Sequence, residues 1–227
     1  MSLKSKDRAS RSYTIEETHK YNILLDTREI FLYGHEGEEE DSGVDHRMSC
    51  NFLKNIKILE ATEANKPIFI HQYSIGGCWN AGMSIYDAIK SCSVPVIVIT
   101  HGIAASMGSI IPQAADLRLS MPHCEWLLHQ GSTGIHGQIW KQARSWMEWE
   151  EKQNKRMMEI YIFRCLNSEF FGDKAENQVI SYINKQFNTK EDWLINAEEA
   201  VEYGFCDGIY GEEGYECIQN IATTIDL

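Results

Sequence analysis

The chain has 227 residues, of which 43% are hydrophobic and 24% are charged, and its formal net charge is −12. This composition is ordinary for a globular protein of one domain, whereas the negative charge argues against a nucleic-acid partner, because binding to phosphates needs clustered Lys and Arg. No apolar run approaches the ~20 residues that span a bilayer, so we expect no membrane segment.

Seven cysteines are spread along the chain at wide spacings, without a C-x-x-C pair. An odd number at such spacings fits neither a zinc site nor a disulfide framework. We therefore expect no metal site and reduced, mostly buried thiols, as is usual in a cytoplasmic protein.

Two charged segments are expected to lie outside the packed core. Residues 1–12 contain four Lys or Arg side chains and one Asp. We interpret residues 1–20 as a flexible basic arm before a single domain over residues 21–227; a shortened transit peptide is the alternative. Residues 36–41 are mostly acidic, which predicts a solvated loop, and their spacing does not fit a calcium-binding loop.

The expected strands are short apolar runs bounded by Pro or Gly, at residues 29–34, 68–70, 96–99, 117–119 and 126–128. The expected helices alternate with them, at residues 44–63, residues 80–91 and from about Ser106 onward. This alternation predicts βαβ units and a parallel sheet, an α/β fold. In such sheets the reactive groups lie at strand ends and at the adjacent helix starts.

Residues 137–166 predict one long helix, because no Gly or Pro occurs from Gln138 to Phe171. Its expected length is about 40–45 Å, at 1.5 Å per residue. A small sheet domain cannot cover such a helix, so we expect it to project and to find a partner. Its Met and Trp residues are interpreted as packing residues, and no cofactor is predicted.

Ser106 is the serine best placed for chemistry, although the lipase-type G-x-S-x-G motif is lacking. It lies among very small residues after a buried strand, where a substrate can approach the backbone. A helix that begins there would direct free N–H groups at the site. An ordinary N-cap serine is the alternative.

Four segments, residues 76–87, 102–108, 128–130 and 197–204, closely resemble the proteolytic subunit of the Clp protease family. They occur in the family's order, and the resemblance runs from about residue 11 to residue 210. It implies the Clp/crotonase-like spiral of βαβ units, with a projecting handle within about residues 131–188.

The resemblance also implies a catalytic triad. Ser106 matches the family's nucleophile, His129 the general base and Asp192 the carboxylate that orients the base. The backbone N–H groups of Gly77 and Met107 match the oxyanion hole. These are the parts that acyl transfer by a serine requires.

The resemblance further implies how substrate and partners bind. The positions that match substrate-binding residues are Gly76, Gln130, Gly131, Ser132, Thr133 and Gly134. In the family the handle interlocks two stacked heptameric rings, and a hexameric AAA+ unfoldase supplies unfolded polypeptides. The resemblance therefore implies a homo-oligomeric serine endopeptidase core, with any ATP use residing in the unfoldase.

Residue by residue, other interpretations stay open. His129 could be a hydrogen-bonded core histidine, and Asp192 could cap a helix or pair with Lys190. His101 and His123 are rival bases, but neither matches the family motif.

The sequence departs from the family pattern at several positions. Ile75 replaces a proline, which removes a fixed φ angle and predicts a looser oxyanion loop. Pro112 is expected to kink the nucleophile helix. Lys190-Glu191 stands where the family often has Asp-Arg, so a ring–ring contact would need a compensating change. About fourteen extra residues lie around residues 163–188.

Two other functions are compatible with parts of this pattern. A catalytically silent subunit of a mixed ring would share the fold, but the presence of all three triad positions argues against it. A crotonase-type acyl-CoA enzyme would share the spiral and the oxyanion hole, but it would bind CoA and would not depend on Ser106.

Overall fold

The structure is a computed structural model that describes residues 14–16, 18–33, 43–62, 66–131 and 139–224. Its sheet has eight strands: β1 (Ile23–Leu24), β2 (Glu29–Leu32), β3 (Ile68–Ser74), β4 (Val96–Ala105), β5 (Leu117–Ser120), β6 (Glu125–Leu128), β7 (Trp193–Ile195) and β8 (Gly208–Ile209). The numbered helices are α2 (His46–Ala61), α3 (Trp79–Lys90), α4 (Met107–Ile110), α5 (Trp140–Cys165), α6 (Glu176–Lys190), α7 (Ala197–Tyr203) and α8 (Ile218–Thr224), with a 3₁₀ helix, η1 (Ile111–Ala114).

The sheet is mostly parallel, as the alternation of strands and helices predicted. Its main path runs β1-β2-β3-β4-β5-β8, and β6 pairs with both β4 and β7. Only β1–β2 and β6–β7 are antiparallel among these pairs. The α/β fold class is therefore confirmed, with the antiparallel pairs as an addition that the sequence did not indicate.

Strand β4 is longer than predicted, and it divides the sheet. Its first half pairs with β5 and its second half with β6. Gly102 lies at the division with φ +58°, and a Cβ there would come within 2.5 Å of the Tyr73 ring. A glycine therefore allows β4 to leave β5 and continue beside β6, where it ends at Ala105, just before Ser106.

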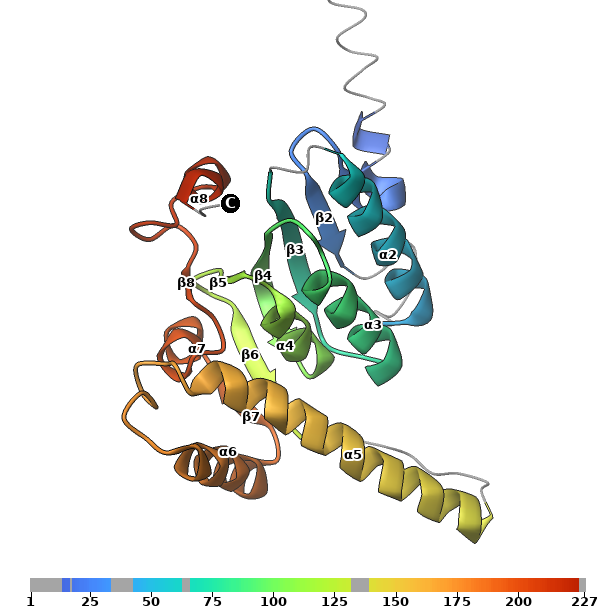
Figure 1. Ribbon diagram of the computed structural model, residues 1–227, viewed down its shortest axis with the longest axis vertical. Helices are drawn as coiled ribbons and strands as arrows, with labels where there is room; N and C mark the ends of the chain where they lie inside the picture. Colours follow the sequence, from blue (N-terminus) through green and yellow to red (C-terminus); the bar gives the residue numbers. More distant parts are fainter. Residues whose placement is uncertain (1–13, 17, 34–42, 63–65, 132–138, 225–227) are drawn as a thin grey trace, which may run out of the picture.

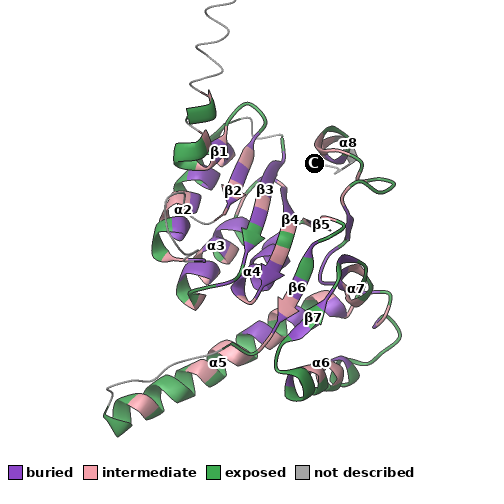
Figure 2. Cartoon of the chain, turned by 180° about the vertical axis from the view of Figure 1, so that it is seen from behind, coloured by how far each residue is buried: buried purple, intermediate pink, exposed green. Residues whose placement is uncertain are grey.

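The two faces of the sheet are covered unequally. Ile70 and Val98 belong to the main core beneath α2 and α3, whereas Phe69 and Ile97 face the other way. This alternation is the pleat of a strand. On the second face, the Ile221 side chain of α8 packs against the apolar residues. Figure 2 shows that burial is concentrated in the sheet and in the helix surfaces against it.

Pro112 was expected to kink the helix that follows Ser106, and it lies just beyond the end of α4. The α-helix lasts four residues and continues as η1 from Ile111, with Pro112 in its first turn. Proline has no N–H to donate into the preceding turn, so the α-helical hydrogen bonds cannot continue. The segment after Ser106 is a short helical turn rather than a long helix.

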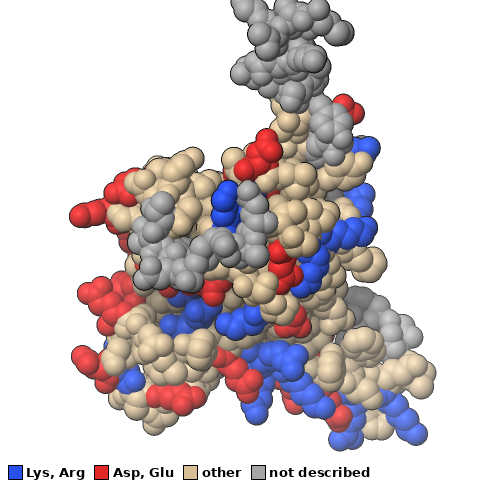
Figure 3. Space-filling view, turned by 45° about the horizontal axis from the view of Figure 1, so that its top comes forward, with Lys and Arg blue, Asp and Glu red and all other residues tan. Residues whose placement is uncertain are grey.

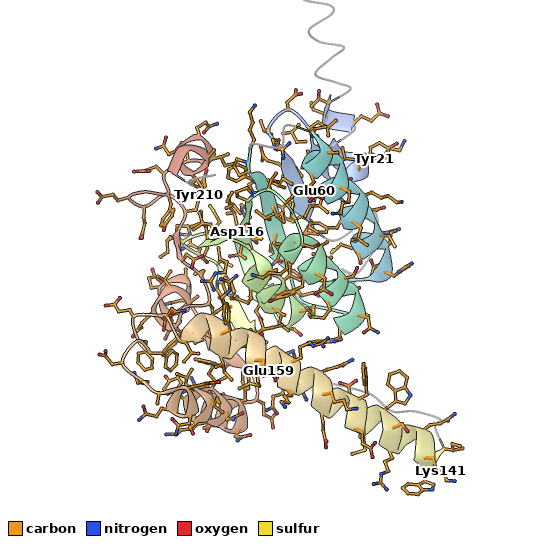
Figure 4. The ribbon with its side chains drawn as sticks, viewed as in Figure 1. Tyr21, Glu60, Asp116, Lys141, Glu159 and Tyr210 are labelled. Atoms are coloured by element: carbon orange, nitrogen blue, oxygen red, sulfur yellow. The ribbon has the colours of Figure 1, made fainter. Side chains whose placement is uncertain are left out.

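Helix α5 projects from the body as predicted (Figure 1). Its 26 residues give a length of about 39 Å. Figure 4 shows Lys141 near the free tip and Glu159 beside the body. The anchored end buries Tyr161 and Cys165 completely, and the Arg164 guanidinium donates to the Gln113 carbonyl at 2.9 Å. The buried residues of α5 all lie from Met157 onward, in the half of the helix next to the body.

The extra residues before Asp192 include α6, which the sequence analysis did not predict. Its buried residues are Val179, Ile183 and Phe187. The ring of Phe187 packs edge-on to Trp193 of β7 at 6.3 Å between centroids. The helix thereby adds an apolar layer beside the short strand that follows Asp192.

The cysteines were expected to be reduced and mostly buried. All seven cysteines are free, but only Cys124, Cys165 and Cys206 are buried, so the expectation of mostly buried thiols was wrong.

In the ranges that the structure describes, no helix is both long and apolar enough to cross a bilayer. Figure 3 shows acidic and basic side chains mixed along the lower edge of the molecule. The predicted basic arm up to residue 13, the acidic loop at 36–41 and residues 132–134 lie outside the described residues.

Candidate active site

Ser106, His129 and Asp192 lie at adjoining ends of three paired strands. Ser106 follows β4, His129 follows β6 and Asp192 precedes β7. Strands β4 and β6 are parallel, and the Ser106 N–H donates to the Leu127 carbonyl at 2.9 Å. Strands β6 and β7 are antiparallel, and extending their register by one residue places His129 opposite Asp192. The fold therefore brings the three predicted residues to one edge of the sheet.

The backbone of Ser106 is strained. Its φ is +52° and its ψ is −121°, a conformation that residues with a Cβ rarely adopt. Such strain is concentrated at functional sites, because it costs stability and persists only where the surroundings impose it. Ser106 is the residue before α4, but its side chain makes no capping hydrogen bond. This geometry does not support the ordinary N-cap interpretation.

The imidazole of His129 lies beside the Asp192 carboxylate. Nδ1 of His129 is 3.3 Å from Oδ1 of Asp192, and the two side chains are 23% and 60% exposed. A carboxylate at Nδ1 favours the tautomer that carries its proton there, which leaves Nε2 as the acceptor. Asp192 forms no ion pair with Lys190 among the described residues, and the N-cap of the following helix is Asn196. Both alternative roles for Asp192 are therefore disfavoured.

A tight turn positions Asp192. Glu191 has φ +58° and ψ −63°, and the Asp192 N–H donates to the Lys190 carbonyl at 2.7 Å. These values define a γ-turn of the rare, strained form. The N–H of Glu191 also closes the end of α6 by donating to Phe187 at 3.0 Å. Helix α6 and the turn together fix the backbone of Asp192 immediately before β7.

Nε2 of His129 is buried and has no hydrogen-bond partner among the described residues. The structure thus shows no hydrogen bond from Ser106 to His129. Both residues line one cavity of about 450 Å³, together with Gly77 and Met107. Catalytic hydrogen bonds often tighten only when substrate is present, so the geometry leaves the pair usable.

The loop at Gly77 is held by a two-bond backbone bridge. The Val44 N–H donates to the Gly76 carbonyl and the Val44 carbonyl accepts from the Cys78 N–H, both at 2.7 Å. In a parallel bridge the residue between these two bonds directs its own N–H to the opposite side. The N–H of Gly77 is therefore left for another acceptor. This bridge constrains the loop that lacks the family's proline at Ile75.

The glycines of this loop are required by close contacts. A Cβ at Gly77 would lie 2.5 Å from the nitrogen and the oxygen of Val44, and a Cβ at Gly76 would lie 2.6 Å from Cβ of Ser106. Met107 is the first residue of α4, so no carbonyl within that helix can accept its N–H. The two expected oxyanion donors thus belong to segments that flank the serine.

Only three of the six predicted substrate-binding residues, Gly76, Gln130 and Gly131, lie among the described residues. Gln130 and Gly131 line the cavity. Gly76 does not line the cavity, but its backbone lies close to the Ser106 side chain. Residues 132–134 lie outside the described residues, so their predicted roles stay predictions.

His101 and His123, the two rival bases, lie outside the cavity that Ser106 lines. His101 approaches His71 on the sheet, with Nε2 of His101 3.0 Å from Nδ1 of His71. His71 in turn contacts the Glu29 carboxylate at 2.8 Å. Burial and repulsion from His71 lower the pKa of His101 to about 4. His123 is exposed on a turn, and neither rival lines the cavity with Ser106.

Helix α5 contributes a wall of the cavity that the sequence analysis missed. Four of its residues line the cavity: Glu150, Gln153, Asn154 and Met157. Their spacing of three and four residues is the signal of one helix face. That signal alone could not reveal what the face lies against, because the helix was expected to project.

Comparisons with known proteins agree on one family. A family model described as Clp protease matches residues 12–213. The chain is 32% identical over 188 residues to the ATP-dependent Clp protease proteolytic subunit 2 of Treponema denticola, covering 82% of this chain and 83% of the relative. A solved structure of a mutant ClpP1 from Listeria monocytogenes superposes with a TM-score of 0.67 at 25% identity, covering 88% of this chain and 99% of that chain.

Proposed function

Because the chain belongs to the Clp protease family, we propose that it is the serine endopeptidase core of a Clp protease and hydrolyses peptide bonds of unfolded polypeptides. The observation that carries the proposal is the placement of Ser106, His129 and Asp192 at three adjoining strand ends. The 3.3 Å contact between His129 and Asp192 and the shared cavity support it.

The chemistry follows from these positions. Ser106 Oγ attacks the carbonyl carbon of the scissile bond while Nε2 of His129 accepts the hydroxyl proton. The imidazolium then gives that proton to the leaving amine, which departs and leaves an acyl-enzyme. Water attacks the ester with His129 again as the base, and Ser106 regains its proton when the acid product leaves. Asp192 holds the imidazole tautomer and stabilises its charged form.

The oxyanion formed in each step needs donors that are in place beforehand. In this proposal the N–H groups of Gly77 and Met107 donate to it, and each donor of this kind contributes roughly 3–4 kcal/mol to lowering the barrier. The Val44 bridge supports the assignment of Gly77, because it uses the neighbouring peptide groups and leaves this one. The start of α4 supports the assignment of Met107.

The proposal extends to assembly, in the cytoplasm, as stacked heptameric rings that receive substrate from a hexameric AAA+ unfoldase. Its support in this chain is the free half of α5, where Trp140, Trp146 and Trp149 are 68%, 53% and 50% exposed. These residues were predicted to be packing residues, but within one chain each Trp side chain is at least half exposed. Large exposed aromatic side chains on a projecting helix are typical of an interface.

A catalytically silent subunit of a mixed ring is the second candidate. The observation in its favour is that Nε2 of His129 has no partner among the described residues and that Asp192 is mostly exposed. A site in this state could depend on assembly or on a partner subunit for its serine–histidine contact. The crotonase-type alternative predicts CoA binding without dependence on Ser106.

The proposed function is tested by intact mass after treatment with a serine-reactive fluorophosphonate. Wild type, Ser106→Ala and Ser91→Ala are compared; Ser91 is exposed at the end of α3 and serves as the matched control. One adduct on wild type and on Ser91→Ala, and none on Ser106→Ala, is the expected result. Folded protein that forms no adduct in the assembled state would favour the silent subunit.

A further inference from the structure

One face of α5 forms a wall of the active-site cavity. This wall is apolar at one end and polar at the other. Glu150, Gln153, Asn154 and Met157 follow the spacing i, i+3, i+4 and i+7, so they lie on one face of the helix. Met157 is 3% exposed at the inner end. Glu150 lies seven residues earlier, about 10 Å farther along the axis toward the free tip of the helix.

The inner part of the cavity is apolar. Met107 and Ile110 are 2% and 3% exposed, and both line the cavity with Met157. Trp79, at the start of α3, also contributes to the lining. An unbranched aliphatic chain that enters beside Ser106 would therefore be surrounded by apolar side chains before it reaches the polar side chains of α5.

The outer part of the cavity carries a single carboxylate. Glu150 is the only acidic residue among the described lining residues, and none of them is Lys or Arg. A carboxylate thus sets the charge of this end of the cavity, and the amides of Gln153 and Asn154 add further hydrogen-bonding groups.

Unlike Glu148 and Glu159 on the same helix, Glu150 has no Lys or Arg three or four residues away. Glu148 lies 3.0 Å from Arg144 and Glu159 lies 4.0 Å from Lys155. The residues three and four positions from Glu150 are uncharged: Trp146, Met147, Gln153 and Asn154. Among the described residues Glu150 forms no ion pair, so a cation from outside the chain could pair with it.

We propose that this cavity is the subsite for the side chain on the acyl side of the scissile bond and that it selects Lys or Arg there. The aliphatic stem would pack on Met107, Ile110 and Met157, as long basic side chains do on apolar surfaces, and the charged end would pair with the Glu150 carboxylate. Asp and Glu in that position would be repelled. This inference rests on the proposed function and deepens it.

The test compares peptide substrates that differ only at that position. Arg is compared with citrulline, which has the same shape without the charge, and with Leu. We expect kcat/KM to be about tenfold higher for Arg than for citrulline in wild type, the size of a charge-assisted contact in a partly exposed site. Glu150→Gln should reduce this ratio at least fivefold, with kcat/KM for the Leu peptide measured on the same variant as the reference. Glu151→Gln is the matched control, because Glu151 is exposed on the same helix and does not line the cavity.

A second measurement separates this inference from the proposed function. Fluorescence anisotropy gives the Kd of labelled peptides that end in Arg or citrulline, on Ser106→Ala and on the double variant that also carries Glu150→Gln. No turnover is needed, so a silent subunit can still be tested. Equal affinity for Arg and citrulline, or an unchanged preference in the double variant, would overturn the subsite assignment even where Ser106 reacts with the fluorophosphonate. A preference for Arg that depends on Glu150 would support it even where Ser106 does not react.

Discussion

The phenol oxygen of Tyr161 lies 2.8 Å from the hydroxyl oxygen of Ser109, and this contact joins α5 to the turn that carries the candidate nucleophile. The Ser109 hydroxyl donates to the Ser106 carbonyl at 2.7 Å. Since Ser109 has one hydroxyl proton, Tyr161 must be the donor in the other bond. Burial raises the pKa of Tyr161, which keeps the phenol protonated and able to donate.

Tyr161→Phe should therefore affect the reactivity of Ser106 as well as stability. Loss of one buried hydrogen bond costs about 1 kcal/mol of unfolding free energy. The Ser109 hydroxyl loses the bond that orients it, so we expect the fluorophosphonate labelling rate to fall several-fold. Tyr182→Phe is the control, because its hydroxyl contacts Tyr203 at 3.3 Å, away from the cavity. Equal labelling rates for the two variants would show that Tyr161 only stabilises the fold.

Asp192→Asn tests the contact that orients the imidazole. An amide in place of the carboxylate can donate to Nδ1 and so favours the wrong tautomer of His129, and it no longer stabilises the imidazolium. We expect the labelling rate to fall about a hundredfold or more with little change in unfolding free energy, because Asp192 is 60% exposed. Asp173→Asn, at an exposed residue before α6, should have no effect. A labelling rate within twofold of wild type would mean that Asp192 does not act on His129.

Gly77→Ala tests the oxyanion loop. A Cβ at Gly77 would lie 2.5 Å from backbone atoms of Val44, at a φ of +144°, so the bridge and the donor must both shift. We expect labelling to fall below detection and unfolding free energy to fall by about 1–3 kcal/mol. Gly211→Ala is the control for the strain of an alanine at positive φ, because Gly211 has a φ of +100° but no atom within 4 Å of such a Cβ. An effect seen only in Gly77→Ala is therefore due to displacement of the oxyanion loop. Comparable labelling by both variants would exclude a special role for Gly77.

Sequence reasoning located the parallel core of the fold because its signals are local. The apolar runs at β3 and β4, bounded by Pro67 and Pro95, and the amphipathic spacing of α2 and α3 are each contained in a short window. The small residues around Ser106 likewise marked a strand end. These features depend on burial and backbone freedom, which a stretch of sequence expresses directly.

The position of Asp192 beside His129 could not be predicted from the sequence pattern around it. Strand β7 has three residues and pairs antiparallel with β6, from which it is separated by α5 and α6. Such a short strand carries little periodicity, and its position is decided by the aromatic packing of Trp193 and Phe187. Only the family resemblance pointed to this aspartate. The lining of the cavity by α5 was missed for the same reason, because it is a contact between segments distant in sequence.

A half-buried histidine pair on the sheet makes stability depend on pH. The pKa of His101 is lowered to about 4, first by burial and then by the neighbouring His71. The pKa of Glu29 is also lowered, first by its hydrogen bond with His71. Tyr33 is the other titratable ring close to His101, edge-on at 6.4 Å. Between about pH 6.5 and pH 4 the unfolded chain therefore binds a proton that folded His101 does not.

The sign of the effect follows from this difference in bound protons. Stability contributed by neutral His101 is present above pH 6.5 and is lost as the pH falls toward 4, with a slope of at most about 1.4 kcal/mol per pH unit. The ionised Glu29 acts in the same direction at lower pH. Urea midpoints measured from pH 7 to pH 4.5 should thus decline, and His101→Gln should flatten the decline because glutamine does not titrate. His123→Gln, at an exposed turn, should leave the curve unchanged. A wild-type curve that is level over this range, or one that His101→Gln does not alter, would contradict the assignment of the proton to His101.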